Sequence, residues 1–192
     1  MIKNINNFIN NNFLLLSYII VIICFIPLFY FSTKFIINVW AYSDALINYS
    51  QGFIRRGFLG EIILFIHKLT DIKLSIIHAY IFIIFSYINI TLYVLILKKI
   101  SNNRLIFFFL LFNPLLLFFP LNDTGGYLRK DIISITLMLF HCYLCSNFHS
   151  SKINLRTYSK LLNTVVIPGI IINTLMHDIQ LFLIPFHLFL SL

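Results

Sequence analysis

Long apolar stretches without a single lysine, arginine, aspartate or glutamate recur along this chain. Three of them, residues 13–31, 74–97 and 105–121, reach or approach the roughly 20 helical residues that cross the hydrocarbon core of a bilayer. The chain is 60% hydrophobic and only 10% charged, with a mean hydropathy of +0.94, which is more apolar than a soluble core requires. We therefore predict an all-α fold, a polytopic membrane helix bundle.

Two further apolar stretches are shorter, and a third ends with the chain. Residues 132–148 and 161–176 are uncharged and are predicted to be spans, while 179–192 stays apolar to its last residue. We expect that last stretch to be a partial span of a truncated chain rather than a re-entrant hairpin. The prediction is about five to six transmembrane helices in a single membrane domain, 1–192, because no repeat, flexible linker or soluble segment interrupts the pattern.

The acidic residues fall on one side of the membrane when the spans are drawn with the N-terminus in the cytoplasm. The outer segments are then 32–73, 122–131 and 177–178, and they hold all six acids: Asp44, Glu61, Asp71, Asp123, Asp131 and Asp178. The inner loops are short and wholly basic, with Lys98, Lys99, Arg104, Lys152, Arg156 and Lys160. Lysines and arginines divide evenly, seven to each side, so their closeness to helix ends, rather than their count, favours a cytoplasmic N-terminus.

In the first outer segment, apolar residues recur at helical spacing directly after Gly57. They are Phe58, Leu59, Ile62, Ile63, Phe65, Ile66 and Leu69, while the opposite side collects Gly57, Gly60, Glu61, His67, Lys68 and Asp71. About 12 residues are too few to cross a bilayer as a helix. We therefore predict an interfacial amphipathic helix within the outer loop 32–73.

Two adjacent arginines, Arg55 and Arg56, stand at the start of this helix between Gly52 and Gly57. The glycines permit a tight turn or a close approach of the backbone to a ligand. Cations beside the positive end of a helix dipole raise the local potential, which suits an anion such as a phosphate or diphosphate. The pattern predicts an anion-binding turn.

The second and third outer segments repeat this pattern of charge. A Gly-Gly turn ending at Gly126 precedes Arg129 and Lys130, and His177 and Asp178 follow a later predicted span. Because all of these segments face one compartment, we expect them to converge on a single outer cavity.

Each group also has an ordinary explanation that the sequence leaves open. Arg55 and Arg56 can reach headgroup phosphates, and Asp44 can cap a helix or pair with either arginine. The residues around Asp123 are typical of a turn, the sequence 129–131 can anchor a span, and 177–178 can be a plain loop.

Packing is the expected role of the remaining histidines and of the cysteines. The histidines are His78, His141, His149 and His187, and the cysteines are Cys24, Cys142 and Cys145. Cys142 and Cys145 lack a second pair of ligands that would complete a zinc site. No metal and no cofactor are therefore predicted.

The charged residues also resemble those of a known group of proteins. The pattern runs from Asp44 and Tyr49 through Gly52-Phe53-x-Arg55-Arg56-Gly57-x-x-Gly60 to Gly126-Tyr127-x-Arg129-Lys130-Asp131 and then His177-Asp178 ahead of Pro185. It resembles multi-pass bacterial membrane proteins of surface-polysaccharide assembly, similar to O-antigen polymerases and GT-C-type glycosyltransferases. The resemblance covers roughly residues 40–185, and its most specific part is the Gly-Phe-x-Arg-Arg-Gly sequence.

That resemblance implies transfer or polymerisation of sugar units on the outer side of the cytoplasmic membrane of a bacterium. The donor would be a polyprenyl phosphate- or diphosphate-linked glycan, and the phosphate would be bound by Arg55, Arg56, Arg129 and Lys130. Asp44 would be the catalytic base, and His177 and Asp178 would orient the acceptor or the base. Membrane lipid and other proteins of polysaccharide assembly are the expected partners, without nucleic acid.

Two other classes stay open. A non-catalytic membrane subunit would use the same charged loops to bind a partner. A transporter of lipid-linked glycans would also gather an anionic lipid with outer arginines, but ion-coupled transport calls for ionisable groups at mid-span. The predicted full-length spans offer only His78 and His141 apart from cysteines.

Overall fold

The structure is a computed structural model that describes residues 39–50, 52, 57–100, 129–176 and 179–191, with residues 15, 19, 22, 23 and 26. Within these ranges the chain is helical and contains no strand, which confirms the all-α prediction for this part of the sequence. The elements are α2 (Val39–Ala45), α3 (Phe58–Thr70), α4 (Leu74–Ile100), α7 (Asp131–His149), α8 (Leu155–Leu161), the π-helical turn η1 (Leu162–Val166), α9 (Ile167–Met176) and α10 (Ile179–Ser191).

Three helical stretches are long and apolar enough to cross a membrane: Leu74–Lys99, Asp131–His149 and Leu155–Met176. They correspond to the predicted spans 74–97, 132–148 and 161–176, and they support the prediction of a membrane protein. The chain also has a shorter apolar helix, Leu181–Ser191, within the predicted partial span 179–192. The predicted span 105–121 and nearly all of 13–31 lie outside the described residues, so a total of five to six spans stays a prediction.

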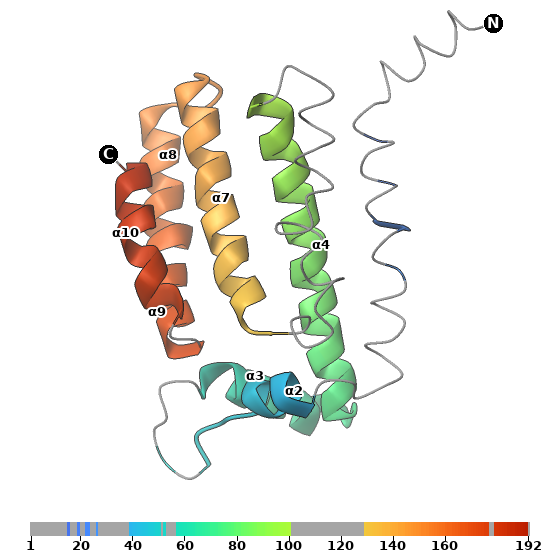
Figure 1. Ribbon diagram of the computed structural model, residues 1–192. Coiled ribbons are helices and arrows are strands. Elements are labelled where there is room, and N and C mark those ends of the chain that lie inside the picture. Colours follow the sequence, from blue (N-terminus) through green and yellow to red (C-terminus); the bar gives the residue numbers. More distant parts are fainter. Residues whose placement is uncertain are drawn as a thin grey trace, which may run out of the picture.

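The spanning helices lie side by side (Figure 1). Helices α4 and α7 run in the same direction, the stretch from α8 to α9 runs back, and α10 again runs in the direction of α4 and α7. Asn89 of α4 donates from Nδ2 to the Ile132 carbonyl oxygen, 3.2 Å away, and so ties α4 to the first turn of α7. Helices α2 and α3 lie across the end of the bundle at which α4 and α7 begin (Figure 1).

The third spanning stretch begins six residues earlier than the apolar pattern predicts, at Leu155 instead of 161. Asn154 starts it, because its side-chain oxygen accepts from the Thr157 backbone N–H at 2.8 Å. The stretch then passes through η1, which ends two residues before Pro168. A proline ring collides with the carbonyl four residues earlier in a regular α-helix, and a π-helical turn at this point fits that constraint. The result is 22 residues, long enough to cross a bilayer.

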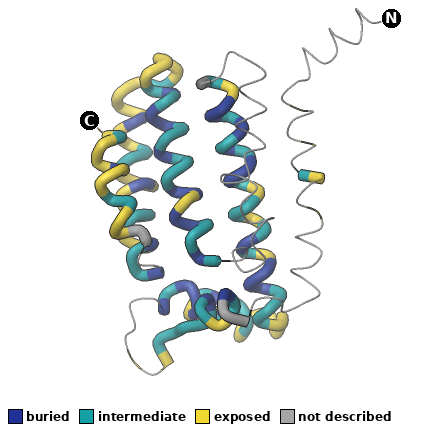
Figure 2. Tube along the Cα trace, in the orientation of Figure 1, coloured by how far each residue is buried: buried dark blue, intermediate teal, exposed yellow. Residues whose placement is uncertain are grey.

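Exposed residues lie along these helices (Figure 2), and many of them are large and apolar. In α10, Phe182 and Phe189 are 75% and 76% exposed, and α4 presents Tyr80, Ile84 and Tyr87 in the same way. Water would disfavour such a surface, whereas lipid chains accommodate it. The exposed apolar faces therefore agree with a bundle that sits in a bilayer.

Polar contacts hold α10 to its neighbours in the bundle. His141 of α7 and His187 of α10 are both buried, with 3.0 Å between their Nδ1 atoms. The Tyr158 hydroxyl lies 3.4 Å from Nε2 of His141, and the Cys145 thiol donates to the Leu190 carbonyl oxygen at 3.1 Å. In an apolar surrounding, such side-chain hydrogen bonds are the specific attraction between helices.

Helix α3 divides its apolar residues between two sides. Leu59 and Ile63 are buried in a cluster with Ala45, Phe82 and Ile133, whereas Phe65 and Leu69 are exposed. Gly60, expected on the polar side, is buried instead. A Cβ atom added there would lie 2.0 Å from the Ile47 carbonyl oxygen. The absence of a side chain lets α3 pass directly against the chain that follows α2. The inner stripe thus packs on the bundle and the outer one faces away from it.

Candidate functional site

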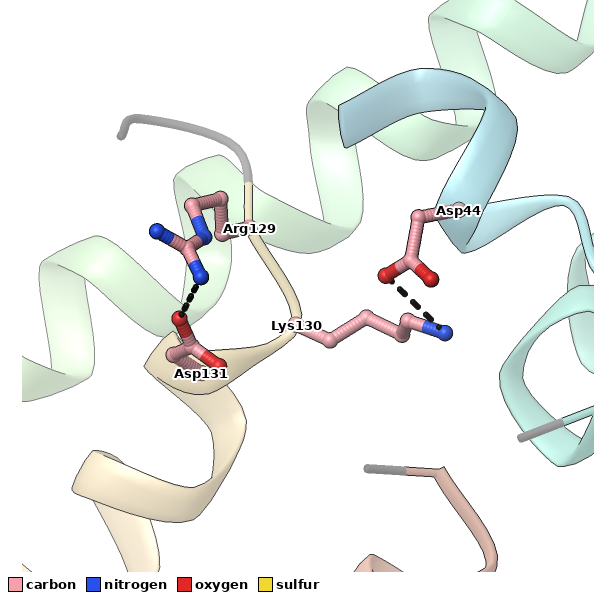
Figure 3. Close-up of polar contacts among 4 residues, drawn as sticks. All are labelled: Asp44, Arg129, Lys130 and Asp131. Carbon is pink, nitrogen blue, oxygen red and sulfur yellow. Dashed lines mark ion pairs between the residues drawn. The ribbon is translucent and has the colours of Figure 1, made fainter. Parts of the chain in front are cut away.

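An ion pair joins two of the predicted site residues at the end of the bundle where α2 and α3 lie. Oδ2 of Asp44, in α2, lies 3.1 Å from Nζ of Lys130, the residue before α7 (Figure 3). The Lys130 side chain is 0% exposed and that of Asp44 is 17% exposed. A buried ammonium requires a compensating charge, and Asp44 supplies it. The structure therefore brings the first and second predicted outer segments together.

A second ion pair forms beside it, within one turn of chain. Arg129 and Asp131 lie 3.1 Å apart, and the Arg129 side chain is 35% exposed. Lys130 extends toward α2, while Arg129 turns back over the first turn of α7 (Figure 3). Asp131 is the acidic residue of that first turn, where it complements the positive end of the helix dipole. Of the two adjacent cations, Arg129 is the more accessible to a ligand.

Small residues set the depth at which α2 holds Asp44. Ala41 and Ala45 are both buried and lie four residues apart, so this face of α2 carries small side chains. Tyr42 contacts His78 of α4 edge to face, with 5.4 Å between ring centroids. Burial raises the pKa of the Tyr42 phenol above its ordinary value, so the hydroxyl stays protonated at neutral pH. Packing of this short helix on α3 and α4 fixes the Asp44 side chain beside Lys130.

The two loop glycines of the prediction differ in conformation. Gly52 has a φ of +114°, a value that strains any other residue, so the backbone there favours glycine. Gly57 precedes α3 with a φ of −83°, which every residue adopts. That conformation does not by itself require glycine, and the Gly57 carbonyl oxygen accepts from the Glu61 backbone N–H, 3.0 Å away.

Several predicted site residues lie outside the described residues: Arg55, Arg56, Gly126, His177 and Asp178. Their assignments to phosphate binding, turn formation and orientation of the acceptor stay predictions. Met176, the last described residue before 177–178, is buried in the cluster that contains Ala45 and Ile133. The end of α9 therefore lies at the same end of the bundle as Asp44 and Lys130.

An apolar cleft begins one helical turn from the ion pair. It has a volume of about 350 Å³ between α4, α7 and α9, and its lining includes Phe85, Leu92, Ile133, Leu137, Gly169 and Met176. Thr136 and Asn173 are the polar side chains at its wall. Its shape and apolar walls suit a hydrocarbon chain. A charged end and an apolar cleft together form an amphipathic site.

Metal ligands do not gather in the part of the chain that the structure covers, where no three His, Cys, Asp or Glu side chains come close enough to hold an ion. The Cys142 and Cys145 thiols are free, and Cys145 is buried. That the protein uses no metal and no cofactor therefore stays a prediction from the sequence.

The fold and site define a helical membrane protein with a buried ion pair at one end of its bundle. Comparison of the chain with protein-family models, with curated proteins and with solved structures found no match. The resemblance to proteins of surface-polysaccharide assembly thus stays a prediction carried by the residues quoted for it.

Two features of this site are not predicted from the sequence. Arg55 and Arg56 are the ion-pair partners that the sequence suggests for Asp44, whereas its partner in the described ranges is Lys130. The second feature is the close approach of α3, at Gly60, to the chain that follows α2. The small residues Ala41, Ala45 and Gly60 are the signal for close packing here, since small residues let backbones approach closely in membranes.

Proposed function

We propose that this protein transfers or polymerises sugar units from a polyprenyl phosphate- or diphosphate-linked donor during synthesis of a bacterial surface polysaccharide such as O-antigen or capsule. The reaction takes place on the outer side of the cytoplasmic membrane, with the protein's N-terminus in the cytoplasm. The observation that carries the proposal is the Asp44–Lys130 pair beside Arg129, next to an apolar cleft. A lipid-linked phosphate has the same two parts, an anionic head and an apolar tail.

Asp44 is the general base in this proposal. Lys130 holds the orientation of the Asp44 carboxylate through the ion pair, in which Nζ and Oδ2 lie 3.1 Å apart. The carboxylate remains 17% exposed, which leaves room for an acceptor hydroxyl to approach. Removal of the hydroxyl proton by Asp44 as the sugar bond forms is ordinary general base catalysis.

The donor phosphate binds beside that base. Arg129 is 35% exposed and adjacent to Lys130, so its guanidinium is suited to contact phosphate oxygens in pairs. Arg55 and Arg56 join it in the proposal, and His177 and Asp178 orient the acceptor. Negative charge that develops on the leaving phosphate in the transition state would be stabilised by these cations.

The lipid tail of the donor occupies the cleft between α4, α7 and α9. Ile133 belongs to the cleft and lies three residues after Lys130, so an anionic head near Lys130 and Arg129 places the tail at the cleft's mouth. Helix α3 serves as the predicted interfacial helix, with Phe65 and Leu69 toward lipid. This arrangement keeps the phosphate at headgroup depth while the tail stays in the hydrocarbon core.

A charge-reversal experiment tests the role of Asp44 against a merely structural role. The variants are Asp44→Asn, the double variant Asp44→Lys with Lys130→Asp, and Asp71→Asn as a control. Asp71 is an exposed acid at the end of α3 with a φ of +55°, and asparagine accepts that conformation. Each is expressed in a host strain that lacks the native gene, and polysaccharide chain length and membrane protein level are measured.

We expect Asp44→Asn to abolish long polymer and Asp71→Asn to leave it unchanged. The double variant restores an ion pair and the protein level but not the polymer, because the carboxylate is then at position 130, before α7, instead of on α2. Normal polymer in Asp44→Asn at normal protein level would overturn the proposal.

The burial of Lys130 favours one alternative, a non-catalytic membrane subunit or a component of a lipid-linked glycan transporter. In that case the ion pair serves only to fix α2 against α7. The double variant would then recover both the protein level and the polymer, since either polarity of the pair holds the helices together. The same experiment therefore separates the two functions.

A further inference from the structure

Among the residues that the structure describes, the opposite end of the bundle carries positive charge without acidic side chains. Lys98 and Lys99 lie in the last turn of α4, and Lys152 follows α7 in the loop that leads to α8. The sequence segments 98–104 and 149–160 hold further cations, Arg104, Arg156 and Lys160, and neither segment contains an aspartate or glutamate. The described aspartates and glutamates, Asp44, Glu61, Asp71 and Asp131, lie at the other end of the bundle, with α2, α3 and the start of α7. Helix ends, water or a bound anion would therefore balance the positive charge here.

A cavity of about 420 Å³ opens among these cations. Its lining consists of Leu95, Lys98, Lys99, Tyr143, Asn147 and Lys152. Two spanning helices, α4 and α7, provide all of it except Lys152. Because these helices end here, the cavity lies at the depth of lipid headgroups in a bilayer.

Neutral groups hold the lysines in place around the cavity. Lys99 donates from Nζ to Oδ1 of Asn147 at 2.5 Å, and its Nζ lies 5.0 Å from the centroid of the Tyr143 ring. Asn147 is in turn fixed by a bond from Nδ2 to the Tyr143 carbonyl oxygen at 3.0 Å. The Lys152 backbone N–H donates to the Asn147 carbonyl oxygen, also at 3.0 Å. Asn147 is thus the centre that sets both Lys99 and Lys152, and neither contact neutralises an ammonium.

We propose that this cavity binds a phosphate-bearing anion, contacted by Lys98, Lys99 and Lys152. Three ammonium groups around one cavity repel each other, and a compact anion with several oxygens relieves that repulsion while accepting a hydrogen bond from each. The apolar wall of Leu95 and the Tyr143 ring suits the ester side of a phosphate. A phosphate diester of an anionic lipid headgroup and a free phosphate ion share this chemistry. The site lies at the other end of the bundle from Asp44 and does not depend on sugar transfer.

Native mass spectrometry of the purified full chain tests this proposal. The protein is released from mixed micelles that contain equal amounts of phosphatidylglycerol and phosphatidylcholine, with or without millimolar inorganic phosphate. The test variant replaces two exposed lysines of the cavity, Lys98→Gln with Lys152→Gln. The control is Lys160→Gln with Arg156→Gln, which removes the same charge at the same end of the bundle, outside the cavity.

We expect the native protein and the control to retain phosphatidylglycerol in preference to phosphatidylcholine, and the cavity variant to bind it at least tenfold more weakly. If inorganic phosphate displaces the lipid or alone raises the thermal unfolding temperature of the native protein but not of the cavity variant, the site accepts free phosphate. If lipid binding persists in its presence, the headgroup is the ligand. Equal anion binding by the two double variants, or no anion binding by the native protein, overturns the proposal.

A single substitution provides a second test of the site if the double variant unfolds. Lys99→Gln retains an amide that can face Asn147 and removes only the charge, and circular dichroism checks its helical content. We expect it to reduce phosphatidylglycerol binding as well, because Lys99 is the cation fixed most firmly at the cavity wall. Unchanged binding by a folded Lys99→Gln protein would contradict its place in the site.

Discussion

His141 of α7 and His187 of α10 meet through their Nδ1 atoms at 3.0 Å, with the two rings stacked and their planes 11° apart. Neutral imidazole has one N–H and one acceptor nitrogen, so one ring donates here and the other accepts. Both side chains are buried, and the bond joins residues 46 positions apart in the sequence. The pair thus holds the short apolar helix α10 against the spanning helix α7.

Loss of that pair should loosen α10. We expect His187→Ala to lower the free energy of unfolding in detergent by about 2 kcal/mol, through one interhelical hydrogen bond and the cavity that the smaller side chain leaves. Phe189→Ala on the same helix is the control, because that side chain is 76% exposed and should change the value far less. Denaturant titration followed by circular dichroism measures both. Additive effects of His187→Ala and His141→Ala would show that the two rings do not interact.

Much of this helical architecture follows from the sequence alone. The uncharged stretch 74–97 became α4, extended through Lys98 and Lys99 because long basic side chains reach the interface from a helix end. The stretch 132–148 became α7 with one more residue at each end. The start at Leu155 could not be read from hydropathy, since Arg156, Ser159 and Lys160 are polar and only the Asn154 cap marks the beginning.

The candidate site was less accessible to prediction. The charge pattern predicts that Asp44 and Lys130 lie on the same side of the membrane. It gives no reason to choose Lys130, rather than Arg55 or Arg56, as the ion-pair partner of Asp44. That choice depends on α2 packing closely enough for Asp44 to reach across to the start of α7, and the packing depends on Gly60 lying against Ile47. Contacts between distant segments arise from shape, which a charge pattern does not contain.

The Asp44–Lys130 pair should respond unequally to loss of its two members. Asp44→Asn leaves the Lys130 ammonium, 0% exposed, without its anion, and we expect a cost of about 3 kcal/mol or more in the free energy of unfolding. Lys130→Met leaves the Asp44 carboxylate, which is 17% exposed and can gain water, so the cost should be smaller. Unfolding in detergent compares the two proteins. A larger loss of unfolding free energy for Lys130→Met than for Asp44→Asn would show that burial of the lysine is not the main reason for the pair.

Glycine-to-alanine substitutions should rank by what the new methyl group meets. At Gly60 it would lie 2.0 Å from the Ile47 carbonyl oxygen, which is backbone and cannot move alone, so we expect a loss of at least about 3 kcal/mol. At Gly169 the nearest atom, at 2.8 Å, is Cδ1 of Leu137, the end of a side chain that can rotate. At Gly52 no atom lies within 4 Å, and only the φ of +114° opposes alanine, at about 1 kcal/mol. Thermal unfolding temperatures of the three variants should rank Gly60→Ala lowest. A lower temperature for either of the other two variants would contradict the close contact between Gly60 and Ile47.

The depth of α3 in the membrane can be measured because the chain has a single tryptophan, Trp40. In a Trp40→Phe background, Phe65→Trp places a reporter on the exposed side of α3, and Ile84→Trp places one on the exposed face of the spanning helix α4. Each protein is reconstituted into lipids brominated either near the headgroup or deep in the acyl chain, and fluorescence quenching is compared. We expect shallow bromines to quench the α3 reporter more strongly, since an interfacial helix buries its apolar face only about 5–10 Å below the headgroups, and deep bromines to quench the α4 reporter. An α3 reporter quenched by neither lipid would show that this helix faces water, and the interfacial role proposed for it would be lost.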